Sequence, residues 1–96
     1  MLDLGVLDQD KDSVAFAINC QADVVGTSGD LYWSQGKKRA FIWTRKKGLV
    51  DLNTCISGFE GMLLEAVDIN DKGQIVCWAT CDGSGQHIVL LDSVVN

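Results

Sequence analysis

Residues 15–28 read Ala-Phe-Ala-Ile-Asn-Cys-Gln-Ala-Asp-Val-Val-Gly-Thr-Ser, an apolar run, a polar turn and a second apolar run. The pattern returns at residues 66–79 as Ala-Val-Asp-Ile-Asn-Asp-Lys-Gly-Gln-Ile-Val-Cys-Trp-Ala. The second turn, Asn70 to Gly73, combines residues that tolerate positive φ with an Asp that caps its own backbone, as tight hairpins require. The flanks are rich in Val, Ile and Ala and alternate over short stretches, which is typical of half-buried strands. The sequence therefore predicts two copies of one β-hairpin.

The repetition extends beyond the hairpins. Asp3-Leu4 matches Asp51-Leu52 at a shift of 48, the hairpins match at a shift of 51, and Phe41 matches Val89 again at 48. The shift changes only in predicted loops, where insertions are tolerated. A period near 50 residues with about four strands per unit is the size of a β-propeller blade.

We therefore predict one all-β domain over residues 1–96, made of two tandem antiparallel four-stranded repeats at 1–48 and 49–96. A compact β-sandwich or barrel is the alternative, because it uses the same alternation of residues. One segment is ambiguous, since Phe59, Met62, Leu63 and Ala66 fall at helical spacing. We favour irregular structure there, leading into a strand that starts at about Ala66.

Composition limits the possible functions. The chain has 96 residues, is 47% hydrophobic and carries a net charge of −5. So short a chain buries only about 60–65% of its unfolded surface, so we expect some apolar surface to be covered by another chain. No apolar run approaches the ~20 residues of a membrane span, and the opening residues lack the features of a signal peptide. Six of the eight Lys and Arg residues lie between Lys37 and Lys47, and the acidic remainder argues against nucleic-acid binding.

Four motifs together resemble the HAF-repeat family, a group of probable extracellular bacterial repeats. They are an Asp-Leu-Gly opening at residues 3–5, Ala-Phe-Ala-Ile-Asn at 15–19, Val-Val-Gly at 24–26, and Ala-Phe-Ile-Trp at 40–43. The second unit matches less closely, with Cys77 where the family has Gly, so packing there must differ. The resemblance implies propeller-type blades and an extracellular or periplasmic location. It brings no catalytic residues, because the family has no established biochemical role.

Two blades cannot close a propeller, which typically needs four to eight. An open pair would leave strand edges and apolar faces exposed. The chain is therefore expected to self-associate as a homo-oligomer, to fold over on itself, or to belong to a longer array of the same repeats. Self-association is the favoured reading.

The best ligand candidates are Tyr32 and Trp33, which lie in a predicted long loop and could stack on a sugar ring. Beside them, Lys37, Lys38 and Arg39 form a cationic triplet, and Arg45 to Lys47 form a second one. Such triplets could bind phosphate or an acidic polysaccharide. They are also typical of charges that protect an apolar strand from aggregation. Phe41 and Trp43 share one face of that strand and are predicted to be core residues.

No metal, cofactor or catalytic site is predicted. Asp8, Asp10 and Asp12 alternate like calcium ligands, but Ser13 and Asn19 stand where an EF-hand loop would need Gly and Glu. We predict that Cys20, Cys55, Cys77 and Cys81 are reduced, small, buried apolar residues. His87 lies near Asp82 and Ser84, but no nucleophile motif Gly-x-Ser-x-Gly accompanies it.

The sequence thus indicates a non-catalytic β-repeat module that binds a protein partner or itself. The alternative is a small carbohydrate-binding propeller built from several chains. It is disfavoured because the Tyr32-Trp33 pair has no counterpart in the shorter loop of the second repeat.

Overall fold

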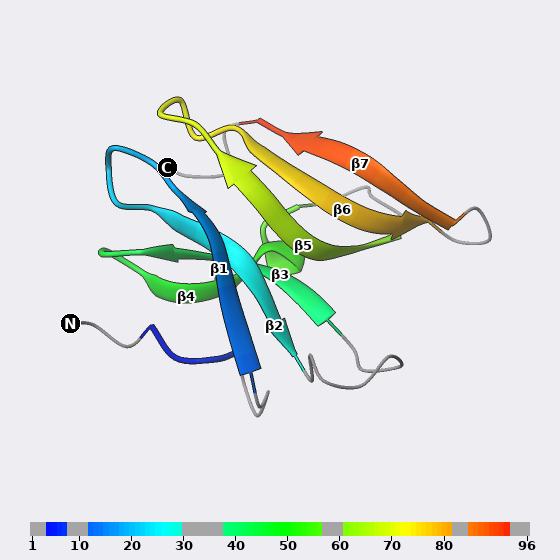
Figure 1. Ribbon diagram of the computed structural model, residues 1–96, viewed down its shortest axis with the longest axis horizontal. Helices are drawn as coiled ribbons and strands as arrows, with labels where there is room; N and C mark the ends of the chain where they lie inside the picture. Colours follow the sequence, from blue (N-terminus) through cyan, green and yellow to red (C-terminus); the bar gives the residue numbers. More distant parts are fainter. Residues whose placement is uncertain (1–3, 8–11, 30–37, 57–60, 82–84, 93–96) are drawn as a thin grey trace.

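The chain forms two antiparallel β-sheets in a computed structural model, which describes residues 4–7, 12–29, 38–56, 61–81 and 85–92 (Figure 1). The first sheet has the order β1-β2-β3-β4, and its strands are β1 (Asp12–Ile18), β2 (Val24–Gly29), β3 (Lys38–Thr44) and β4 (Gly48–Asp51). The second sheet has the order β5-β6-β7, with β5 (Gly61–Ile69), β6 (Ile75–Cys81) and β7 (Gly85–Leu91). A 3-10 turn, η1 (Leu52–Thr54), follows β4. The predicted all-β class is confirmed.

Both predicted hairpins are present, and they match in detail. Each has a bulge at the same place, between Ala15 and Ala17 in β1–β2 and between Ala66 and Asp68 in β5–β6. In each turn an Asn side chain folds back on the backbone. The Oδ1 of Asn19 accepts from the N–H groups of residues 21 and 23, and that of Asn70 from residues 72 and 74, at 2.9–3.0 Å.

Residues 49–52 were expected to form the first strand of the second repeat, but they do not belong to the second sheet. Residues 49–51 belong to β4, which pairs with β3 and completes the first sheet, and Leu52 begins η1. Within the described residues the second sheet has three strands rather than the expected four.

The prediction of irregular structure before Ala66 is wrong, because β5 begins at Gly61. Its pairing with β6 is interrupted by two register shifts, between Leu63 and Glu65 and between Ala66 and Asp68. Each bulge inserts a residue and moves the side-chain alternation by one. Leu63 and Ala66 are therefore both buried although they are three residues apart. Buried residues three positions apart are also typical of a helix, so the sequence pattern was ambiguous here.

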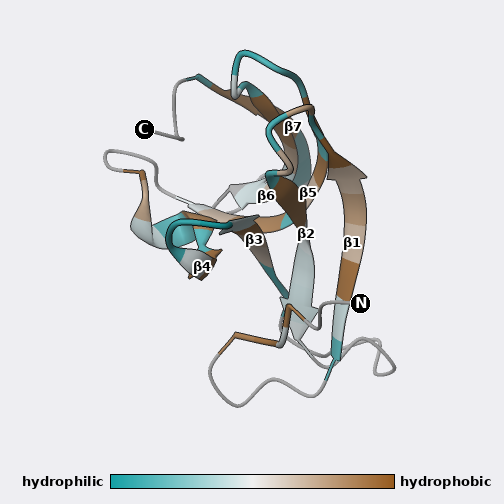
Figure 2. Cartoon of the chain, turned by 90° about the vertical axis from the view of Figure 1, so that its left-hand side faces the viewer, coloured by the Kyte–Doolittle hydropathy of each residue, from teal (hydrophilic) through white to brown (hydrophobic). Residues whose placement is uncertain are grey.

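The main core lies between the two sheets, and its largest members are Ile42, Leu52, Leu63, Ile69, Ile75 and Leu91. A second cluster of Leu7, Val24 and Phe41, with Leu4, Trp43 and Leu49 beside it, covers the opposite face of the first sheet. Phe41 is only 2% exposed, so its predicted place in the core is confirmed. Figure 2 shows that β1 and the β5–β7 sheet are largely apolar, whereas the hairpin turns are hydrophilic. Among the described residues, no helix is long and apolar enough to cross a bilayer.

Candidate functional site

The described cations of the two predicted triplets lie at opposite ends of β3. Lys38 and Arg39 begin β3, and the second triplet, Arg45 to Lys47, forms the turn after it. Seven residues of extended chain place the two groups about 23 Å apart. Tyr32, Trp33 and Lys37 lie outside the described residues.

Carboxylates accompany the two described cations of the first triplet. Lys38 Nζ lies 3.1 Å from Glu65 Oε1 on β5, and Arg39 Nη1 lies 3.4 Å from Asp51 Oδ2 on β4. The Lys38 pair connects the two sheets, and the Arg39 pair holds β4 beside β3. Both are partly exposed, so each contributes little stability. An anionic ligand at either cation would have to compete with a carboxylate already in place.

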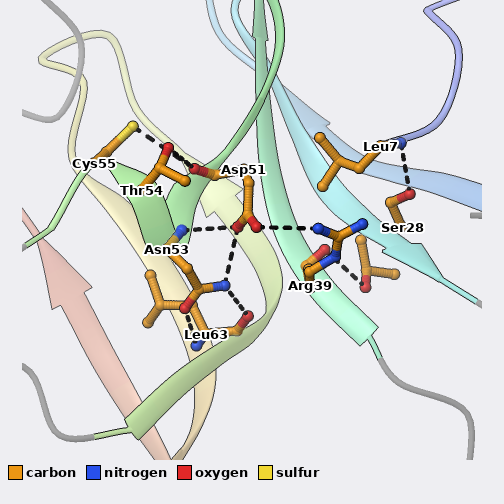
Figure 3. A network of polar contacts seen from close by, with 9 residues as sticks. Leu7, Ser28, Arg39, Asp51, Asn53, Thr54, Cys55 and Leu63 are labelled. Atoms are coloured by element: carbon orange, nitrogen blue, oxygen red, sulfur yellow. Dashed lines mark hydrogen bonds and ion pairs between the residues drawn. The ribbon is translucent and has the colours of Figure 1, made fainter. Parts of the chain in front are cut away.

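A polar network continues from Arg39 through Asp51 to Asn53 and the second sheet (Figure 3). Asp51 Oδ1 accepts from the backbone and side-chain N–H groups of Asn53 at 2.9 and 3.0 Å. Asn53 Oδ1 accepts from Leu63 N at 2.8 Å, and Asn53 Nδ2 donates to Leu63 O at 3.0 Å. The Asn53 amide therefore pairs with β5 as a neighbouring strand would. Its role is structural, since every polar atom of this amide has a protein partner.

The two hairpin turns lie side by side (Figure 1). Asn19 Nδ2 donates to Asn70 O at 3.1 Å, and Cys20 N donates to Asp71 Oδ1 at 2.8 Å. The hydrogen bond and the negative charge of Asp71 raise the pKa of the exposed Cys20 thiol. The bonds from Cys20 lower the pKa of Asp71. A raised pKa disfavours the thiolate, which is the nucleophilic form of cysteine.

Among the described residues, the cysteines and carboxylates do not form a metal site. Cys77 is buried within β6, and burial raises the pKa of its thiol to about 12. Cys20 and Cys55 are exposed, so the prediction that the cysteines are buried is wrong for these two. Exposure follows from their places, in a turn and just after η1. The described part of the chain contains no cluster of three or more His, Cys, Asp or Glu suited to a metal ion, and Asp8 and Asp10 lie outside it.

The most prominent surface feature is apolar. Val76 and Trp78 on β6 pair directly with Leu90 and Ile88 on β7. All four side chains lie on the face of the second sheet that is turned away from the core, and we name this set the β6–β7 outer face. Trp78 is 38% exposed, Ile88 65% and Leu90 58%. Large side chains this exposed, paired across two strands, are typical of an interaction surface.

Sequence reasoning did not single out this surface, although the signal was present. Residues 88–91 read Ile-Val-Leu-Leu, a continuous apolar run. Such runs are typical of strands that are buried on both faces. Among the described residues, β7 is covered on one face only.

Comparisons of the chain with protein-family models, with curated proteins and with solved structures give no match.

Proposed function

We propose that this chain is a non-catalytic β-repeat module that functions through self-association. The observation that supports this most is the β6–β7 outer face, where three large apolar side chains are at least 38% exposed. Burying a side chain of this kind contributes about 1.5–3 kcal/mol. Exposure of these side chains to water therefore costs free energy in the isolated chain. Covering them with an apolar protein surface would recover that free energy.

The two sheets are, in this proposal, two units of one repeat of the HAF-repeat type. From Val14 to Thr27 and from Glu65 to Trp78, their hairpins share a bulge position, the turn hydrogen bonds and the register at a shift of 51 residues. A second bulge in β5, between Leu63 and Glu65, has no counterpart in β1. Units that stack face to face bury a continuous core, and a terminal unit has one face left over. The β6–β7 outer face fits that description. The blades of a ring of several chains, or of a longer array, would be built in this way.

The test is the native mass of the chain measured by light scattering over a concentration series. We expect a mass that rises with concentration above the 10.4 kDa of one chain. A mass that stays at that of one chain up to about millimolar concentration would overturn the proposal.

A further inference from the structure

The packing of the first sheet on the second indicates what kind of surface could cover the β6–β7 outer face. At the shifts of 51 and 48, the β6–β7 outer face corresponds to Val25, Thr27, Ala40 and Ile42 of the first sheet. Those four residues are at most 4% exposed, and Val25, Ala40 and Ile42 belong to the core between the sheets. The same face is thus buried in the first unit and exposed in the second.

The opposite faces show the reverse at Ala15 and Ile18, which are exposed, whereas Val24 is buried in the second cluster. Ala66, Ile69, Ile75 and Leu91 receive the first sheet and are at most 8% exposed. Their counterparts in the first sheet are Ala15, Ile18, Val24 and Trp43, on the face turned away from the second sheet. We name this set the β1–β3 outer face. Ile18 is 64% exposed, whereas its counterpart Ile69 is 6% exposed.

The residue that packs over this face, Leu4, also has a counterpart in the second unit. Leu4 packs beside Val24 and Phe41, and its counterpart Leu52 lies in the core between the sheets. The β1–β3 outer face therefore resembles the face of the second sheet that packs on the first. It differs in that Ile18 is exposed.

We propose that a second copy of this chain docks head to tail, with its β1–β3 outer face on the β6–β7 outer face of the first. The contact would repeat the packing of the first sheet on the second. This inference rests on the proposed function and specifies its surfaces. Because two different faces meet, the contact is heterologous, and its repetition closes a ring or extends a filament.

Two variants test this geometry. Leu90→Asp places a charge on one face and Ile18→Asp on the other. Both residues are more than half exposed in the single chain, so each variant keeps its fold, which circular dichroism verifies. Burial of an unpaired carboxylate is costly, so each substitution should weaken association by about 100-fold or more. Val14→Asp is the matched control, because Val14 is an exposed β1 residue on the other face of its sheet.

We expect each variant to be monomeric and the control to keep the wild-type mass. An equimolar mixture of the two variants should form a dimer, because each retains the face that the other has lost. A mixture that stays monomeric would overturn the head-to-tail geometry. If instead one variant alone keeps the wild-type mass, like faces meet and the head-to-tail geometry is wrong. Wild-type association that Leu90→Asp leaves intact would overturn the inference but not the proposed function. A monomeric wild type would overturn the proposed function itself.

Discussion

Ala22 holds a backbone conformation that suits glycine. Its φ is +64°, and the corresponding residue of the other turn, Gly73, has a φ of +82°. Both N–H groups donate to the carbonyl of the Asn that starts the turn, at 3.1 Å. The left-handed conformation costs an L-residue with a Cβ about 1–2 kcal/mol. The first turn therefore keeps its shape at a cost that the second turn avoids.

We expect Ala22→Gly to raise the free energy of unfolding by about 0.5–1 kcal/mol, since relief of strain exceeds the added entropy of the unfolded chain. Gly73→Ala should lower it by about 1 kcal/mol. Urea denaturation measures both. Changes of the same sign in the two variants would contradict this account of the turns.

Gly26 marks a close approach between β1 and β2. A Cβ at this position would lie 1.9 Å from the carbonyl oxygen of Val14. That oxygen belongs to the backbone beside the β1 bulge and cannot move without breaking the hairpin. The counterpart of Gly26 is Cys77, which is fully buried in β6, so the two hairpins differ in local packing.

Gly26→Ala should therefore destabilise the fold by about 3 kcal/mol or more, because overpacking forces the backbone to shift. Thermal unfolding followed by circular dichroism would show a much lower melting temperature than the wild type. Gly48→Ala is a useful comparison, because its added Cβ meets nothing within 4 Å and only the positive φ opposes it. Equal losses in the two variants would mean that the close approach has no energetic effect.

At the scale of elements, η1 joins the two sheets through one side chain. Asn53 makes two hydrogen bonds to the backbone of Leu63 on β5. The amide substitutes for a strand neighbour and fixes where β5 begins to pack. Leu52, fully buried beside it, contributes the apolar half of the same connection.

Asn53→Ala should lower the free energy of unfolding by about 2–3 kcal/mol, since the partly buried partners on Leu63 lose their bonds. Thr54→Ala is the matched control. Its hydroxyl donates to Asp51 O at 2.7 Å in an exposed position, and we expect a loss below about 1 kcal/mol. Chemical denaturation that gives equal losses for both variants would contradict the role of Asn53.

Elements that are specified by neighbouring residues in the chain could be predicted from the sequence. Features that depend on which strands pair, and in which register, could not. The hairpin turns follow from Asn, Asp and Gly at fixed offsets, and β3 follows from its apolar run between charges. The start of β5 was missed because its two bulges disturb the period of two. The place of β4 was missed because a match between repeats identifies a strand but not its neighbour.

The same division applies to the surface. Whether Ile88 and Leu90 face a core or water depends on which sheet covers β7, and that is a property of the whole molecule. The sequence indicated excess apolar surface but not its location. Tyr32, Trp33 and Lys37, which the sequence favoured for a glycan, lie outside the described residues. Lys38 and Arg39 have carboxylate neighbours.

For the whole molecule, the central claim is that the β6–β7 outer face is covered when chains associate. Hydroxyl-radical footprinting at a low and a high protein concentration tests it at the side chains themselves. We expect oxidation of Trp78, Ile88 and Leu90 to fall several-fold at high concentration, while oxidation of exposed Val14 stays constant. Unchanged oxidation of these three residues in a sample whose mass has risen would contradict the account.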